Sequence, residues 1–395
     1  MTTRSTPRSS SGRFDYLDGI RGLAILAVVI VHWGLGRTTV GRGGFISVDI
    51  FFVLSGFVIT TLLWRSSTLT GKSLGRSWVT FIRARIRRLY PALLGLVVAG
   101  SALMLLIPGT PVQAGDIARN GALTLLQLTW FPEMLGNVAD PFRQTWSLGV
   151  EWIFYLSWPV VVLMARSKGL SPRTLAWWSL GSGLLLVAAS TAVLRAEAFY
   201  FAPPGRFGQI LIGAALALAF VHAPPVIRAR PVHTALTALG LLAVVAFALA
   251  GAHPFSDVGR LFGSPMALVI AVLLIHHGYA VSGGPVHALV ASRPVTLLGR
   301  VSYSLYLWHW IPVYLLDKDK IALPEPVLAL LGVSLVVVLT TASYVLLERP
   351  FISTRRATLA PQAPSSGPVP AFPSTQDPVG PETELSDRVA PEGTA

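Results

Sequence analysis

The chain contains no cysteine among its 395 residues. This absence excludes disulfide bonds, thiolate metal sites and any reaction that passes through a cysteinyl acyl-enzyme. Charged residues are also scarce, since Asp, Glu, Lys and Arg make up 12% of the chain, against about 25% in soluble domains. The hydrophobic fraction is 53% and the mean hydropathy is +0.63. Together these values predict a polytopic membrane protein.

The chain also has no cleavable signal pattern at its start, where the residues MTTRSTPRSSSGRFDY are polar and basic. The first apolar helix is therefore expected to be retained as a signal-anchor. The net charge of +13 could suggest a nucleic-acid partner. However, the basic residues fall in short loops between apolar stretches, a pattern that membrane orientation produces. We therefore expect a lipid bilayer as the setting and no nucleic acid.

Apolar stretches of about the length needed to cross the hydrocarbon core recur along the chain. They cover residues 20–36, 45–64, 89–107, 146–165, 174–194, 206–222, 233–250, 261–281, 297–316 and 326–347. A shorter stretch at 121–131 either spans the membrane or only dips into it. If it does not span, every basic loop falls on the cytoplasmic side, as the positive-inside rule requires. The sequence thus predicts an all-α protein of the cell membrane, multi-pass, with about ten transmembrane helices and both termini cytoplasmic.

The domain organisation expected from composition is simple. Residues 1–14 form a polar cytoplasmic N-terminus, and residues 15–352 form one membrane domain with no second globular domain. After about residue 355 the chain becomes rich in proline and polar residues. Such a segment cannot bury enough apolar surface to fold, so residues 353–395 are expected to be a disordered cytoplasmic tail.

Arg21 and His32 are separated by residues that are all apolar or small. In an α-helix this spacing makes about three turns, so both side chains return to nearly the same face, roughly 16 Å apart. An ionisable group inside a membrane helix is a functional candidate, because burying it without a partner costs so much free energy.

Seven stretches of the chain carry a resemblance to a known family. They are DGIRGLAILAVVIVHW (18–33), SVDIFFVLSGFVIT (47–60), FIRARIRRLYPALL (81–94), TWSLGVEWIFYLSWP (145–159), RFGQILIGAALAL (206–218), LLGRVSYSLYLWHW (297–310) and ERPF (348–351). In this order they resemble the acyltransferase-3 family of membrane O-acyltransferases, over roughly residues 14–352. One departure is Trp152, where many members have a second acidic residue. The resemblance implies transfer of an acyl group from cytoplasmic acyl-CoA to a hydroxyl group.

Two residues are candidates for the catalytic step. In the family that the chain resembles, the histidine that follows an arginine after ten intervening residues has a catalytic role, and His32 occupies that position after Arg21. The His32 imidazole suits a general base at neutral pH. The alternative role is a hydrogen bond that holds helices together. Glu151 could orient the imidazole, accept the relayed proton, or pair with an arginine such as Arg206. A purely structural ion pair is the alternative for Glu151.

The remaining candidates are expected to bind substrate. Arg21, Arg85 and Arg88 could pair with the CoA phosphates, although basic residues there also set topology and contact anionic lipids. Asp49 could orient an acceptor hydroxyl or the His32 ring, or it could cap its helix. Tyr303 and His309 could line the substrate cavity. Ser55-Gly56 is expected to permit close helix approach or a break in the helix. No metal site is expected, because His276-His277 have no nearby carboxylates.

These observations predict a membrane-bound O-acyltransferase. Its donor is acyl-CoA, with acetyl the commonest group that the resemblance implies and longer chains left open; no further cofactor is expected. Its acceptor is a hydroxyl-bearing carbohydrate of the cell surface or a secondary metabolite such as a macrolide. A transporter or flippase is the main alternative, since intramembrane histidine and carboxylate groups also suit proton-coupled transport. A sensor or scaffold that keeps the fold without activity is a third.

The topology prediction can be tested by labelling single cysteines, because the chain has none of its own. Residues 108–145 are expected to lie outside, so the Asn137→Cys variant should react with an impermeant maleimide added to intact cells. The Ser171→Cys variant should react only after the membrane is opened. Labelling of the second variant in intact cells would mean that 121–131 spans the membrane.

Overall fold

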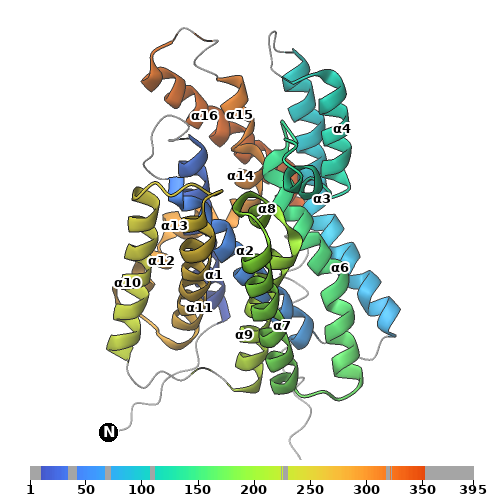
Figure 1. The fold of residues 1–395 in the computed structure, drawn as a ribbon, viewed down its shortest axis with the longest axis vertical. Helices are drawn as coiled ribbons and strands as arrows, with labels where there is room; N and C mark the ends of the chain where they lie inside the picture. The colour runs from blue at the N-terminus through green and yellow to red at the C-terminus, as the bar shows by residue number, and fades with distance from the viewer. Residues whose placement is uncertain are drawn as a thin grey trace, which may run out of the picture. The chain divides into compact units, whose positions relative to one another are not determined.

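The computed structural model describes residues 10–33, 42–66, 73–106, 112–223, 225, 230–316, 321 and 323–351. Every regular element in these ranges is a helix (Figure 1). The long helices are α1 (Ser10–Trp33), α2 (Ser47–Arg65), α3 (Leu74–Leu106), α6 (Trp146–Ser167), α7 (Pro172–Val193), α9 (Pro203–His222), α10 (Arg230–Leu249), α11 (Ser264–Ala280) and α16 (Glu325–Ser343). The short ones are η1 (Arg42–Ile46), α4 (Ala114–Leu125), α5 (Trp130–Met134), η3 (Arg143–Thr145), α8 (Ala196–Phe201), η4 (Gly259–Gly263), α12 (Gly284–Val290), α13 (Arg293–Arg300), α14 (Ser302–Trp308), α15 (Ile311–Leu315) and η5 (Tyr344–Glu348). The all-α prediction is confirmed.

Within the described residues, eight helical segments are long and apolar enough to cross a membrane, judged by length and composition. The two other predicted spans are 20–36, of which the described part, 20–33, lies in α1, and 297–316, which covers most of the run from α13 to α15. That second span is not continuous, which corrects the prediction. Pro312 explains one of its breaks, because proline has no N–H for an intrahelical bond and so stands at the start of α15.

The ambiguous stretch at 121–131 is interrupted in the same way. Helix α4 ends at Leu125, and Gln127 adopts the left-handed conformation at φ 62° before α5 begins. The 12 residues of α4 extend about 18 Å, which is short of the roughly 30 Å hydrocarbon core. The segment is therefore too short and too broken to span the core as one helix, and its place relative to the membrane stays a prediction.

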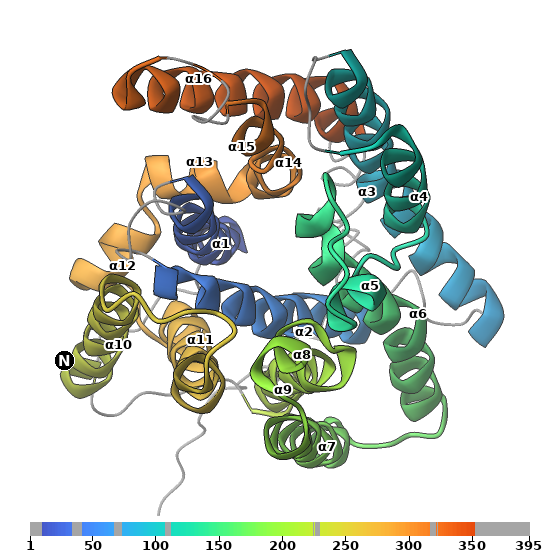
Figure 2. The same cartoon turned by 45° about the horizontal axis from the view of Figure 1, so that its top comes forward.

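Helix α1 is enclosed by other helices (Figure 2). It contacts α2 and α11 on one side and α13 and α14 on another, and it packs most extensively on α13. Glycine makes that approach possible. A Cβ atom on Gly22 would lie 2.0 Å from the Val295 carbonyl oxygen, and one on Gly299 would lie 1.7 Å from the Asp18 carbonyl oxygen. The two backbones touch, which fixes the position of α1 and of the side chains that it carries.

Helices α2 and α9 cross by the same device. A Cβ atom on Gly56 would lie 1.9 Å from the Ile210 carbonyl oxygen, and one on Gly213 would lie 1.9 Å from the Val53 carbonyl oxygen. Small residues at helix crossings are the usual means of association in membranes, where lipid is as apolar as the side chains. The predicted role of Gly56 in close helix approach is confirmed.

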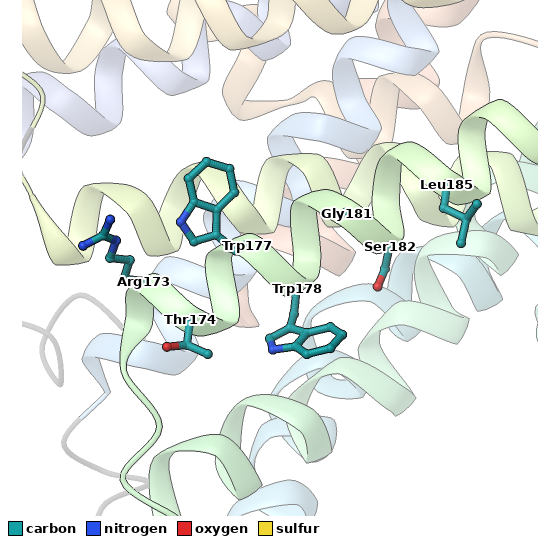
Figure 3. A pocket seen from close by; sticks show the side chains of 7 residues that line it. All are labelled: Arg173, Thr174, Trp177, Trp178, Gly181, Ser182 and Leu185. Carbon is teal, nitrogen blue, oxygen red and sulfur yellow. The ribbon is translucent and has the colours of Figure 1, made fainter.

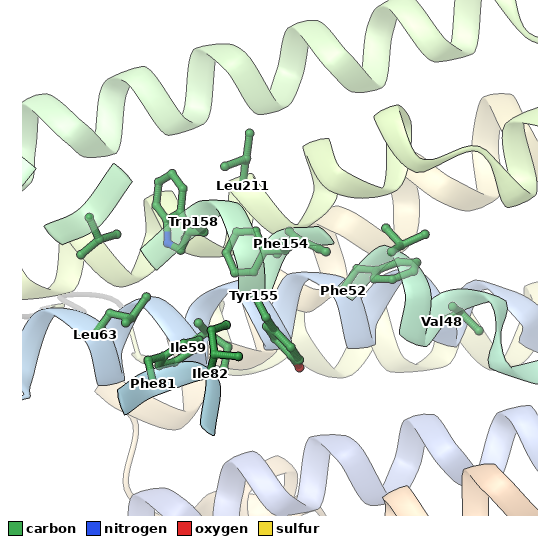
Figure 4. Packing of buried hydrophobic residues seen from close by; sticks show 14 of the residues in the cluster. Val48, Phe52, Ile59, Leu63, Phe81, Ile82, Phe154, Tyr155, Trp158 and Leu211 are labelled. Atoms are coloured by element: carbon green, nitrogen blue, oxygen red, sulfur yellow. The ribbon is translucent and has the colours of Figure 1, made fainter. Parts of the chain in front are cut away.

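The largest group of buried apolar side chains joins α2, α3, α6 and α9 (Figure 4). Its members include Phe52, Phe81, Phe154 and Trp158. One polar contact crosses the group, since the Trp158 indole N–H donates to the Thr60 hydroxyl at 2.8 Å. Dispersion contacts and this buried hydrogen bond hold the four helices together. The proline-rich tail expected at 353–395 lies outside the described residues.

The glycine contacts predict a contrast between two alanine variants. Gly22→Ala places a methyl group against the Val295 carbonyl, so α1 and α13 must separate, at a cost of about 1–3 kcal/mol. Gly181→Ala on α7 meets nothing within 4 Å and should leave the protein equally stable or gain about 0.5–1 kcal/mol. Thermal unfolding in one detergent should show a lower Tm only for Gly22→Ala. Equal melting temperatures would contradict the tight crossing.

Candidate functional site

His32 and His309 lie side by side although they are far apart in the sequence. The Nδ1 atom of His32 is 3.0 Å from the Nε2 atom of His309. His32 stands in the last turn of α1, and His309 follows α14 and is fully buried. The Trp310 ring packs edge-on against His32, with ring centres 4.6 Å apart. The structure therefore brings the predicted base and a predicted cavity residue into one hydrogen-bonded pair.

The backbone decides which ring nitrogens of this pair carry protons. The Nδ1 atom of His309 lies 2.8 Å from the Tyr306 carbonyl oxygen. A carbonyl can only accept, so Nδ1 of a neutral His309 carries the proton and its Nε2 atom has the lone pair. His32 must then donate from Nδ1 to that lone pair. It follows that the Nε2 atom of His32 holds a lone pair available to accept a proton.

The start of α6 holds the turn that carries His309. The hydroxyl of Tyr306 donates to the Gln144 carbonyl and lies 2.7 Å from the Ser147 hydroxyl oxygen. The Gln144 amide donates to the Leu307 carbonyl at 2.9 Å. The TWSL and SLYLWH stretches, which the sequence presents as separate motifs, thus form one hydrogen-bonded unit.

Glu151 does not contact the histidine pair through any hydrogen bond that the described residues make. Its two carboxylate oxygens accept from the Ser55 hydroxyl and the Tyr155 hydroxyl, each at 2.6 Å. Its suggested pairing with Arg206 is wrong, because that arginine forms an ion pair with Asp49. Glu151 instead ties α6 to α2 and faces the arginine group described below.

Asp49 and Arg206 form a buried ion pair, with 2% of each side chain exposed. Arg206 also donates from Nε to the Tyr200 carbonyl at 2.9 Å, and its guanidinium lies 5.0 Å from the Phe199 ring centre. Asp49 lies in the first turn of α2, and its carboxylate accepts from Arg206. A buried carboxylate needs such a partner in a membrane protein. The structure places Asp49 in this pair and not against the His32 ring.

Arg21 and Arg88 belong to a second polar group, further along α1 from His32. Arg21 lies 3.7 Å from the Asp18 carboxylate. The charge of Arg88 acts on Arg21, on Asp18 and on Glu348. The Arg21 and Arg88 guanidinium groups lie close enough to act on each other, and two guanidinium groups in one place can pair with the oxygens of a phosphate chain.

Helical spacing divides the four arginines at positions 83–88 of α3 into two pairs. Arg83 and Arg87 are exposed, whereas Arg85 is buried and Arg88 is partly buried. The guanidinium of Arg85 lies over the rings of Phe81 and Tyr155, at 5.1 and 5.5 Å from their centres. Residues three apart share a helix face. Arg85 and Arg88, the two residues of α3 that were predicted to bind the donor, therefore face inward, whereas Arg83 and Arg87 do not.

Sequence reasoning missed Glu348 and Ser304. The Glu348 carboxylate is 1% exposed and accepts from the Ser304 hydroxyl at 2.7 Å. The signal was available, since Glu348 opens the ERPF motif, to which no role was attached. Tyr303, predicted to bind substrate, donates its hydroxyl to the Leu89 carbonyl at 2.8 Å. That contact packs α14 on α3 beside the arginines.

A cavity of about 570 Å³ lies away from all of these residues (Figure 3). It follows α7 and is lined by Arg173, Trp177 and Trp178 among others. Both tryptophans are more than half exposed. Exposed tryptophan beside arginine is typical of the membrane–water interface, so this surface groove fits lipid contact better than catalysis.

Metal binding has little support in the part of the chain that the structure describes. No group of three His, Asp or Glu side chains there is arranged to hold an ion. His233 and His276 approach each other, with 3.1 Å between Nε2 and Nδ1. Two imidazoles alone do not complete the four-coordinate site that zinc takes in proteins.

Comparison with known proteins gives consistent results. The peptidoglycan O-acetyltransferase OatA of Listeria monocytogenes is 27% identical over 371 residues, covering 88% of this chain and 57% of the relative. A Bacillus subtilis protein, YrhL, provisionally named a peptidoglycan O-acetyltransferase, is 26% identical over 355 residues, covering 85% of this chain and 54% of the relative. The chain thus spans little more than half the length of these relatives. No solved structure matches it.

A family model described as an acyltransferase domain matches residues 14–348. That range contains the histidine pair, the arginine group and the described helices, apart from residues 10–13 of α1 and the helical residues after Glu348. The chain therefore belongs to the acyltransferase-3 family.

Proposed function

We propose that the protein is a membrane O-acetyltransferase that moves an acetyl group from acetyl-CoA to a hydroxyl of a cell-surface glycan. The observation that carries this proposal is the hydrogen bond between His32 and His309, which leaves the Nε2 lone pair of His32 available as a general base. The names of the relatives support acetyl as the group and a glycan as the acceptor.

The proposed reaction needs one base and no enzyme nucleophile. Nε2 of His32 takes the proton of the acceptor hydroxyl while the oxygen attacks the thioester carbonyl carbon. The tetrahedral intermediate collapses, the C–S bond breaks, and the CoA thiolate takes the proton from the His32 imidazolium. His309 accepts from Nδ1 throughout, so it holds the His32 ring in one tautomer and stabilises its charged form. This is the role that an orienting group plays in other histidine-dependent acyl transfers.

Arg21 and the inward arginines of α3 are proposed to hold the phosphates of the donor. Arg21 lies on the same helix as His32, roughly 16 Å away along the axis by helical rise. A donor bound there must carry an extended arm between its phosphates and its thioester, which is the construction of acyl-CoA. Guanidinium groups match phosphate oxygens in charge and in planar geometry.

One feature of the structure also fits the alternative of a transporter or flippase. The broken segment from α13 to α15 resembles the discontinuous helices that line transport sites. The two interpretations differ in their products. Purified protein in liposomes should form an O-acetyl ester from acetyl-CoA and a soluble glycan, whereas a flippase would move its lipid substrate without forming an ester.

The histidine pair predicts a graded response to substitution. His32→Gln keeps a hydrogen bond but cannot take a proton, so kcat should fall about 10²- to 10⁴-fold. His309→Gln still offers an oxygen that accepts from His32, so it should retain more activity than His309→Leu. Steady-state transfer rates between pH 5 and 8 measure each effect.

The double variant His32→Gln/His309→Leu should be no slower than His32→Gln alone, because residues that act as one unit are not additive. Correct insertion of every variant is checked by its Tm in detergent. Near wild-type kcat in His32→Gln across the pH range would place the base elsewhere.

The donor site predicts a change in one Michaelis constant. Arg21→Ala should raise the KM for acetyl-CoA more than the KM for the glycan, and Arg21→Lys should recover only part of the loss because the bidentate fork is absent. Arg83→Ala, on the exposed face of α3, is the matched control and should leave both constants unchanged. An unaltered donor KM in Arg21→Ala would reduce that residue to a topology signal.

A further inference from the structure

Arg143 reaches the histidine pair from a part of the chain that none of the motifs covers. It opens η3, just before α6, in the segment 108–145 that the sequence places outside. Its guanidinium lies 5.8 Å from the Trp310 ring centre, and that ring packs against His32. Its charge also acts on His32. A cation therefore stands beside the proposed base on the side that the predicted topology makes external.

Glu133 holds this arginine in place. The Glu133 carboxylate accepts from the Arg143 Nη2 atom at 3.1 Å and from the Ala139 backbone N–H at 2.8 Å. Only 2% of the Glu133 side chain is exposed, against 29% of the Arg143 side chain. Burial raises the pKa of Glu133, and the Arg143 guanidinium opposes that rise. The carboxylate is thus a fixed, buried support, and the guanidinium is the accessible member of the pair.

The pairing determines what Arg143 can bind. One edge of the guanidinium is occupied by Glu133, and its other N–H groups keep donor capacity. Because the carboxylate neutralises the local charge, these donors suit uncharged oxygen atoms better than a second anion. Trp310 adds a large, partly exposed ring beside them. Hydrogen-bond donors next to an aromatic face are the combination that a sugar requires, since its ring has an apolar C–H face and a rim of hydroxyl groups.

We infer that Arg143, held by Glu133 and flanked by Trp310, forms the acceptor subsite and binds the neutral hydroxyl groups of a sugar ring next to the one that is acylated. This inference rests on the proposed function and names its acceptor class as an uncharged carbohydrate. Arg143 is a binding residue here, and Glu133 is a positioning residue that acts through it.

The test compares four proteins with acetyl-CoA as donor and chitotetraose, a neutral glycan, as the probe acceptor. Arg143→Gln should raise the KM for chitotetraose about 10- to 100-fold, the loss expected for hydrogen bonds from a charged group. The KM for acetyl-CoA should change less than threefold. Glu133→Gln should raise the acceptor KM by a smaller factor, because the arginine remains without its support. Arg119→Gln is the control, since that exposed arginine on α4 bonds to its neighbours Asp116 and Asn120, at 3.0 and 3.2 Å, and to neither Glu133 nor Trp310; it should match the wild type.

A double variant separates binding from structural damage. In Arg143→Gln the buried Glu133 loses its counter-charge, which could disturb the segment. Arg143→Gln/Glu133→Gln removes both charges, and its acceptor KM should stay as high as that of the single variant. Recovery of the wild-type constant would show that Arg143 binds nothing and would overturn the inference. A rise in the donor KM equal to that for the glycan would overturn it as well.

Salt and direct binding complete the test. The acceptor KM of the wild type should change less than twofold between 50 and 500 mM NaCl, because screening weakens only charge–charge attraction. A steep increase for this uncharged probe would show that ion pairs within the protein, and not hydrogen bonds to the sugar, control binding, and would overturn the inference. Chitotetraose binding to His32→Gln, followed by calorimetry, needs no chemistry. If adding Arg143→Gln to His32→Gln abolishes that binding, the subsite is supported. If the wild type binds chitotetraose in this way but transfers no acetyl group, the proposed reaction fails and the subsite stands.

Discussion

The hydrogen bond between His32 and His309 is the contact on which the other features of the site depend. It forms only if the packing of α1 and of the turn after α14 keeps the two ring nitrogens 3.0 Å apart. The glycine crossing of α1 with α13 sets one side of that separation. The hydrogen bonds of Tyr306 and Gln144 set the other. A shift of about 1 Å in either element would break the bond, and distant packing residues therefore have direct influence on the proposed base.

The polar residues inside the helix bundle follow a common rule. Among the described residues, the buried carboxylates of Asp49, Glu133 and Glu348 have Arg206, Arg143 and Ser304 as partners, and the partly buried Glu151 accepts from two hydroxyl groups. An unpartnered charge in that environment would cost several kcal/mol. The histidine pair satisfies the rule without a net charge, since each ring donates one hydrogen bond. Neutrality suits a base, because it leaves the proton-accepting form as the resting form.

Much of this arrangement could be predicted from the sequence, and the exceptions have physical causes. Hydropathy located the long helices, since the length of an apolar run is a local property. Hydropathy did not predict the interruptions within 297–316, because an interruption depends on single residues such as Pro312 and not on average composition. Spacing on one helix identified Arg21 and His32.

Contacts between distant segments were harder to predict. The partner of His32 lies 277 positions away, and no spacing rule connects them. For the same reason Arg206 was assigned to Glu151, whereas the fold brings it to Asp49. Arg143 and Glu133 belong to no motif, so only the structure shows that they stand beside the site.

The early end of α14 has a consequence for how the site can vary. A helix that stops leaves its last carbonyls without intrahelical partners. Two of them, on Tyr306 and Leu307, accept instead from the His309 ring and the Gln144 amide. The acceptor that fixes the His309 tautomer is thus a main-chain atom, which no side-chain substitution removes. The residue at which α14 ends therefore determines which of the two histidine rings donates the hydrogen bond and which accepts it. These roles would exchange only if α14 were longer.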